Sequence, residues 1–194
     1  MPEQRESTII VTEEEMVFSG EYISVVARRF LNKRDGGKGL WECVKRKTHG
    51  RIVAVAAFTA DREIILTKTY RVPAQAWVIE LCAGLMDKSG ESEVEVAGRE
   101  LLEETGYTAT ILPAPLFQGA FNAGLLEDQM AVYMGLNSIK VIEPRLETGE
   151  DIEVLRIPLD KADHFLHNPP PKVVVDIKIF GVVNDPRVKS LMNM

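Results

Sequence analysis

The amino-acid sequence predicts an α+β fold in which one well-marked helix lies between strand-rich segments. The helix begins after Ser92, a favoured N-cap residue, and Glu95 completes a capping box that satisfies two free backbone N–H groups. It ends at Gly106, because glycine readily adopts the left-handed conformation that commonly terminates helices. Apolar and β-branched runs both precede and follow this helix, which indicates a mixed arrangement and excludes a helical bundle.

The expected strands fall into two groups, separated by a break near His49–Gly50. We therefore expect a small β-rich part at residues 1–50 and a main domain at residues 51–194. Pro158–His167 is expected to form a short helix, whereas the alternating pattern of Val173–Val183 favours a strand. The other expected strands are Thr8–Val11, Tyr22–Phe30, Leu40–Val44, Arg51–Thr59, Glu63–Tyr70, Trp77–Cys82, Thr108–Leu112, Gln129–Leu136 and Ile152–Ile157.

The composition restricts the class of protein and its partners. The chain of 194 residues is 45% hydrophobic and 27% charged, which suffices for a buried core. Its net charge of −6 argues against a nucleic-acid partner, since phosphate backbones attract basic surfaces. The longest apolar run, Ile52–Phe58, is too short to cross a bilayer, and Met1–Ser7 carries no apolar leader. Cys43 and Cys82 form neither a disulfide framework nor a zinc pair, so we expect a cytoplasmic protein.

Acidic side chains are concentrated on one flank of the helix. Glu93, Glu100 and Glu104 share this flank, with Glu103 beside them, and carboxylates three or four residues apart repel each other. Arg99 is the only basic residue in this stretch. A solvated acidic face is one interpretation, although such faces usually carry interleaved lysines. The other interpretation is that the carboxylates bind Mg²⁺ or Mn²⁺. The reaction that matches such a site is metal-assisted attack of water on a phosphate.

The residues around this helix resemble the Nudix box. Gly84–Glu91 and Arg99–Tyr107 follow the pattern of a glycine, five residues, a glutamate, seven residues, then Arg-Glu-aliphatic-x-Glu-Glu-x-Gly-aliphatic, and the match is complete from Glu91 to Gly106. There are two departures, because six residues separate Gly84 from Glu91 and Tyr107 replaces an aliphatic residue. The extra residue lies in a loop, so we expect it to reshape the turn and to leave the helix spacing intact.

The resemblance implies an α/β/α sandwich with a mixed sheet and a site for Mg²⁺, or alternatively Mn²⁺. By resemblance the metal ligands are Glu100, Glu103, Glu104 and the carbonyl oxygen of Ala83, and Glu103 also takes part in catalysis. Arg99 is expected to orient these glutamates through charge-assisted hydrogen bonds. Its alternative is an ordinary surface ion pair within the helix.

Three further segments resemble the ADP-ribose and UDP-sugar pyrophosphatases of this family. These segments are Trp41–Arg46, Tyr70–Pro73 and Ile79–Gly84. In that branch the N-terminal β part packs across a two-fold axis, so the resemblance implies a homodimer. It also implies that Trp41 stacks on the nucleobase and that the substrate site includes Arg46, Arg71, Glu80 and Leu85. A buried core residue remains an alternative for Trp41, and a plain surface residue for Arg71.

A catalytic base is expected on the acidic loop Glu147–Glu153, because a mobile carboxylate can close over substrate and position water. Glu150 matches the family best and Glu153 is next, while an ordinary solvated turn is the alternative. The resemblance also makes Val173–Val183 a closing helix, an interpretation that we adopt over its local strand propensity.

The resemblance therefore implies Mg²⁺-dependent hydrolysis of nucleoside diphosphate sugars, such as ADP-ribose and UDP- or GDP-sugars, to a nucleoside monophosphate and a sugar phosphate. A MutT-like nucleoside triphosphate or dinucleotide pyrophosphohydrolase is one alternative, and the N-terminal part with Trp41 argues against it. A non-catalytic Nudix-fold binding module is another, although binding alone does not need Glu100, Glu103 and Glu104. A calcium-binding acidic helix without catalysis is a third alternative, but this sequence lacks the loop ligands of an EF-hand.

Overall fold

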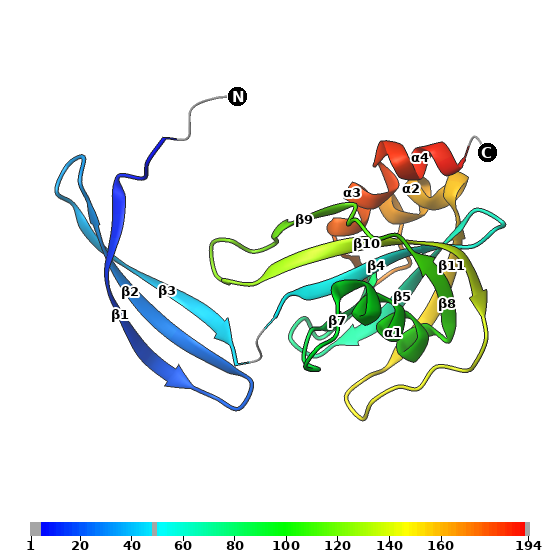
Figure 1. Ribbon diagram of the computed structural model, residues 1–194, viewed down its shortest axis with the longest axis horizontal. Helices are drawn as coiled ribbons and strands as arrows, with labels where there is room; N and C mark the ends of the chain where they lie inside the picture. The colour runs from blue at the N-terminus through cyan, green and yellow to red at the C-terminus, as the bar shows by residue number, and fades with distance from the viewer. Residues whose placement is uncertain (1–4, 48–49, 193–194) are drawn as a thin grey trace. The chain divides into compact units, whose positions relative to one another are not determined.

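The computed structural model describes residues 5–47 and 50–192 and divides into two compact units (Figure 1). The first unit contains the residues before Gly50 together with Ala120–Gln129. The second unit contains Gly50–Gly119 and Met130–Met194. The expected boundary falls beside Thr48 and His49, which lie outside the described residues.

The first unit contains an antiparallel sheet of β1 (Ile9–Ser19), β2 (Ile23–Asn32) and β3 (Lys38–Arg46). Strand β1 is longer than the expected Thr8–Val11, because its acidic middle has basic partners across the sheet. Glu14 accepts hydrogen bonds at 2.7 Å from Arg28 Nε and at 2.6 Å from Lys45 Nζ. These cross-strand pairs stabilise a strand whose run of glutamates resembles a loop in the sequence.

The second unit is built on a mixed sheet. Its strands are β4 (Ile52–Phe58), β5 (Glu63–Arg71), β6 (Ala76–Glu80), β7 (Cys82–Leu85), β8 (Tyr107–Ile111), β9 (Phe117–Ala120), β10 (Gln129–Lys140), β11 (Ile152–Pro158) and β12 (Val173–Val175). The central strands lie in the order β12-β6-β5-β4-β10-β8, while β11 pairs with β5, β7 with β4 and β9 with β10. Strand β10 is parallel to β4, and β12 is parallel to β6.

Helices cover both faces of this sheet, with α1 (Glu93–Thr105) on one face and α2 (Leu159–His167), α3 (Lys178–Val183) and α4 (Pro186–Leu191) on the other (Figure 1). Alternate residues of β4 therefore enter two different cores. Val53 and Val55 pack with α1, whereas Ala54 and Phe58 pack with the other three helices. The expected α/β/α sandwich with a mixed sheet is confirmed. Among the helices of the described residues, none has the length and apolar character needed to cross a membrane.

Several segments of the second unit also differ from the sequence-based expectation. The adopted helix at Val173–Val183 is wrong for its first part, which forms β12 and is followed by α3. Asp176 separates the two elements, because its carboxylate accepts a hydrogen bond at 3.0 Å from the backbone N–H of Lys178. The expected strand Trp77–Cys82 is divided into β6 and β7, and β9 and α4 were not anticipated.

Candidate active site

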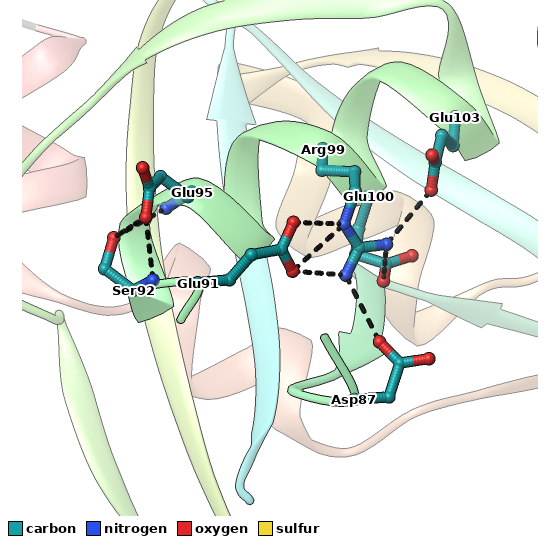
Figure 2. A network of polar contacts seen from close by, with 7 residues as sticks. All are labelled: Asp87, Glu91, Ser92, Glu95, Arg99, Glu100 and Glu103. Atoms are coloured by element: carbon teal, nitrogen blue, oxygen red, sulfur yellow. Dashed lines mark hydrogen bonds and ion pairs between the residues drawn. The ribbon is translucent and has the colours of Figure 1, made fainter. Parts of the chain in front are cut away.

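The boundaries of α1 agree with the capping signals in the sequence. Ser92 Oγ accepts a hydrogen bond at 3.3 Å from the backbone N–H of Glu95, and the Glu95 carboxylate accepts one at 2.7 Å from the Ser92 N–H (Figure 2). Gly106 ends the helix with a φ of +75°, a conformation that side chains rarely adopt. These caps fix where α1 begins and ends, and they therefore help to decide which glutamates face the sheet.

Arg99 is the centre of an ion-pair network on α1 (Figure 2). Its Nε lies 3.0 Å from Glu91 Oε1, and its Nη1 lies 2.7 Å from Glu100 Oε1 and 3.1 Å from Glu103 Oε2. Asp87, in the turn with the extra residue, lies 3.7 Å away. The Arg99 side chain is only 17% exposed, and its hydrogen bonds to Glu91 raise the pKa of its guanidinium. Arg99 is therefore not an ordinary surface residue.

Strand β7 approaches α1 closely at Gly84. A Cβ atom at this position would overlap the carboxylate of Glu100. Burial raises the pKa of Glu100, although the charge of Arg99 opposes that shift. Ala83, whose carbonyl we expected as a ligand, directly precedes Gly84 on the same strand. The contact between β7 and α1 therefore depends on the absence of a side chain at Gly84.

Glu104 belongs to the buried face of α1 and not merely to the flank that the helical pattern predicted. It is 8% exposed, whereas Val96, Leu101 and Thr105 on the same helix are fully buried. Burial raises the pKa of the Glu104 carboxyl to about 8, and the charges of Glu100 and Glu150 act in the same direction. A hydrogen bond with the Cys82 thiol and the charge of Arg71 oppose the shift. A buried carboxylate of this kind is costly to ionise without a cation.

The acidic residues of α1 fit a hard divalent cation by their chemistry. No group of three or more His, Cys, Asp or Glu side chains is arranged to hold a metal among the described residues. Arg99 instead engages Glu100 and Glu103. Glu104 is nevertheless a buried carboxylate, and the backbone at Gly84 leaves no side chain between β7 and Glu100. Oxygen donors of this type are those that Mg²⁺ and Mn²⁺ prefer.

The two candidate bases lie in different surroundings. Glu150 belongs to a turn in which its Oε2 accepts a hydrogen bond at 2.8 Å from the Glu147 backbone N–H, and its charge acts on Glu104 and Arg71. Glu153 lies on β11 opposite Lys68, whose Nζ is 2.6 Å from its carboxylate. Residues alternate along a strand, so Glu153 shares a face with Leu155, which packs away from α1. The charge of Glu150 therefore acts on Glu104, whereas Glu153 pairs with Lys68 on the other face of the sheet.

Arg71 and Glu80 form a pair across β5 and β6. The Nε of Arg71 lies 2.7 Å from Glu80 Oε1, and the Glu80 side chain is only 12% exposed. Arg71 is 49% exposed, so its guanidinium is anchored by Glu80 and still accessible. Leu85 ends β7 and is half-buried opposite Ile52. These residues lie in the same unit as α1.

Trp41 and Arg46 lie on β3 in the first unit. Trp41 is 55% exposed, so the alternative of a buried core residue is wrong. Its indole Nε1–H donates a hydrogen bond at 2.8 Å to the carbonyl oxygen of Gly124. Arg46 Nε lies 2.7 Å from Asp128 Oδ2. Both side chains are thus held by the segment that joins β9 to β10.

The sequence did not reveal several contacts that organise the site. Glu93 was expected beside Glu100 and Glu104, but its carboxylate accepts a hydrogen bond at 2.7 Å from the Tyr133 hydroxyl and lies 3.4 Å from Arg51. The Cys82 thiol beside Glu104 was also not anticipated. These contacts join residues far apart in the chain, so no local pattern announces them.

The chain is similar to known proteins in its sequence and in its fold. Residues 48–176 match the family model described as the NUDIX domain. An ADP-ribose pyrophosphatase of Bacillus subtilis is 33% identical over 150 residues, which covers 76% of this chain and 77% of the relative. A uridine diphosphate glucose pyrophosphatase of Bos taurus is 27% identical over 188 residues, covering 77% and 82%. The crystal structure of an ADP compounds hydrolase superposes with a TM-score of 0.73 at 19% identity and covers 98% of this chain and 95% of that one.

Proposed function

The chain belongs to the Nudix family of hydrolases, and we propose that it cleaves the diphosphate bond of nucleoside diphosphate sugars to a nucleoside monophosphate and a sugar phosphate. The observation that carries the proposal is the buried carboxylate of Glu104 beside Glu100 and Glu103 on one capped helix. The names of the relatives in Bacillus subtilis and Bos taurus support a nucleotide sugar as the substrate class.

Nudix hydrolases use divalent metal ions, and for this chain we propose Mg²⁺, with Mn²⁺ as an alternative. Glu100, Glu103, Glu104 and the Ala83 carbonyl would hold the ion, which when bound neutralises negative charge on the diphosphate oxygens. Arg99 would keep its hydrogen bonds to Glu91 and so maintain the orientation of the neighbouring glutamates.

Glu150 is proposed as the general base that accepts a proton from the attacking water. Its support is its placement, because its charge acts on Glu104 and Arg71 while Glu153 pairs with Lys68 on the other face. The Glu147 N–H holds the Glu150 carboxylate through one oxygen, Oε2. A carboxylate anchored in this way remains able to take up a proton at its other oxygen.

Trp41, Arg46, Arg71, Glu80 and Leu85 are proposed to bind the substrate. An exposed indole offers a flat surface on which any nucleobase can stack, which suits several nucleotide sugars. Arg71 presents a guanidinium that Glu80 fixes from one side, so its remaining N–H groups can reach a phosphate.

The N-terminal sheet is proposed to bind a second copy of the chain. Strand β1 exposes a run of large apolar side chains that an isolated protein would leave in water: Ile9, Ile10, Val11, Met16, Val17 and Phe18. Patches of this kind mark protein interfaces, and symmetric dimers are the commonest assemblies. Light scattering should give twice the 21.7 kDa chain mass, and the double variant Val17→Glu/Phe18→Glu should lower the measured mass towards that of one chain.

A cytoplasmic location is proposed, with which the free Cys43 and Cys82 agree.

A panel of substrates with product analysis tests the function. We expect ADP-ribose and UDP- or GDP-sugars, incubated with Mg²⁺, to yield a nucleoside monophosphate and a sugar phosphate. Glu104→Gln should lose most turnover and bind Mn²⁺ more weakly. Glu143→Gln, a change at an 85% exposed carboxylate, is the matched control. Release of pyrophosphate from nucleoside triphosphates, with nucleotide sugars left intact, would replace the proposal by the MutT-like alternative.

A further inference from the structure

The segment Asn122–Asp128, which joins β9 to β10, lies along the outer edge of β3. We call this segment the strap. The Val44 backbone N–H donates a hydrogen bond at 2.8 Å to the carbonyl oxygen of Leu125, and Val44 and Leu126 form a parallel bridge. The strap therefore continues the sheet for a short distance beyond β3.

Ion pairs hold the end of the strap to β2 and β3. Glu127 pairs with Arg28 and lies 3.5 Å from Lys45, while Asp128 pairs with Arg46 at 2.7 Å. The Asp128 side chain is only 12% exposed, whereas that of Arg46 is 37% exposed. A charge-assisted hydrogen bond to a largely buried carboxylate restricts the arginine side chain more than a fully exposed ion pair does.

The strap contacts both residues of β3 that the proposed function uses for substrate binding. Gly124 fixes the indole of Trp41 through its carbonyl oxygen, and Asp128 fixes the guanidinium of Arg46. An exposed tryptophan without such an anchor would sample several rotamers and would lose that freedom on stacking. Each side chain ordered on binding costs affinity, so prior anchoring favours the complex.

We propose that the strap is a positioning element, which holds Trp41 and Arg46 in one orientation and thereby sets the affinity for the nucleotide part of the substrate. The inference rests on the role of Trp41 in the proposed function. It adds that Glu127 and Asp128, through their ion pairs with β2 and β3, control binding by way of Trp41 and Arg46. Because the diphosphate is cleaved by residues of α1, weakening the strap changes KM and leaves kcat largely intact.

Tryptophan fluorescence provides a test that does not depend on catalysis. The chain has two tryptophans, so Trp77→Phe leaves Trp41 as the only reporter. In this background we compare the wild-type strap with Glu127→Ala/Asp128→Ala, using AMP and adenosine as quenchers. Asp160→Ala/Asp163→Ala, on the exposed side of α2, removes the same two charges and is the matched control.

The strap variant should show lower Trp41 anisotropy without ligand, three- to tenfold weaker quenching by AMP and adenosine, and a comparable rise in KM. A general charge effect predicts the opposite for AMP, since removing negative charge favours an anion, and it predicts no change for adenosine. The milder variants Glu127→Gln and Asp128→Asn should change the same quantities less, and circular dichroism checks that each variant is folded.

Equal affinities for adenosine in the strap variant and the wild type would overturn the inference. Absence of Trp41 quenching in the wild type would also overturn it. If nucleotide sugars were still hydrolysed in that case, the proposed function would stand. Strap-dependent quenching without hydrolysis of any nucleotide sugar would support the strap and refute the proposed function. The two proposals therefore fail separately.

Discussion

Gly84 of β7 lies directly against the carboxylate of Glu100 on α1, so close that a single added methyl group would overlap it. The φ angle of Gly84 is not in the left-handed region, so the requirement for glycine at this position comes from space and not from backbone conformation. This contact brings the backbone of the strand next to one of the proposed metal ligands. The glycine that opens the Nudix box therefore has a packing role that the sequence pattern alone does not reveal.

Replacing this glycine by alanine tests the contact. Gly84→Ala should displace the Glu100 carboxylate, weaken Mn²⁺ binding measured by electron paramagnetic resonance, and lower the unfolding free energy by about 1–3 kcal/mol. Gly119→Ala is the control, because a Cβ there meets nothing within 4 Å. Unchanged metal affinity in Gly84→Ala would show that Glu100 does not depend on this close approach.

The buried carboxyl of Glu104 should make the metal-free protein less stable as the pH rises. Its pKa in the folded state is about 8, against an ordinary value of 4.5, so the folded state retains a proton that the unfolded state releases. The stabilising contribution is complete below pH 4.5 and is lost as the pH rises towards 8. In EDTA, thermal melts should show Glu104→Gln gaining stability over the wild type by about 1–3 kcal/mol at pH 8.5 and little at pH 4.5.

Addition of Mn²⁺ should reverse this order at pH 8.5, because the cation stabilises the ionised wild-type carboxylate and the amide binds metal poorly. Glu143→Gln is again the exposed control and should melt with the wild type at each pH. If the wild-type protein were as stable as Glu104→Gln in EDTA at pH 8.5, that result would contradict the inference that Glu104 is buried with no cation to neutralise its charge.

The sequence predicts the local features of the fold well, because they depend on local chemistry. The helix from Ser92 to Gly106 is confirmed at both ends, since its caps involve residues only a few positions apart. Strand β1 was predicted too short, because its glutamates are balanced by Arg28 and Lys45 on other strands. The division of Val173–Val183 into β12 and α3 likewise depends on pairing with β6, which no local pattern contains.

The candidate site shows the same distinction between local and distant contacts. Spacing along α1 places Arg99 beside Glu100 and Glu103, as the sequence suggests. It does not show that Tyr133 removes Glu93 from the cluster, or that Cys82 faces Glu104. Side-chain partners across a sheet depend on register, and register is set by the whole fold.

The capping box should contribute measurably to the stability of α1. Ser92→Ala removes the acceptor for the Glu95 N–H, and loss of an N-cap typically costs about 0.5–2 kcal/mol. For a chain of this size the melting temperature should fall by about 2–4 °C for each kcal/mol. Ser89→Ala, in the exposed turn before the helix, is the matched control. Equal melting temperatures for the two variants would refute the contribution of the cap.

The two candidate bases of the acidic loop have different partners, which makes them separable by mutation. Glu150→Gln should lower kcat by about 10²–10⁴, the usual range for loss of a general base, with a small change in KM. Glu153→Gln removes a 56% exposed partner of Lys68 on the face away from α1, so its kcat should stay within about twofold of wild type. A large loss of kcat in Glu153→Gln, with Glu150→Gln unaffected, would require the loop to rearrange so that Glu153 leaves Lys68 and reaches the side of α1.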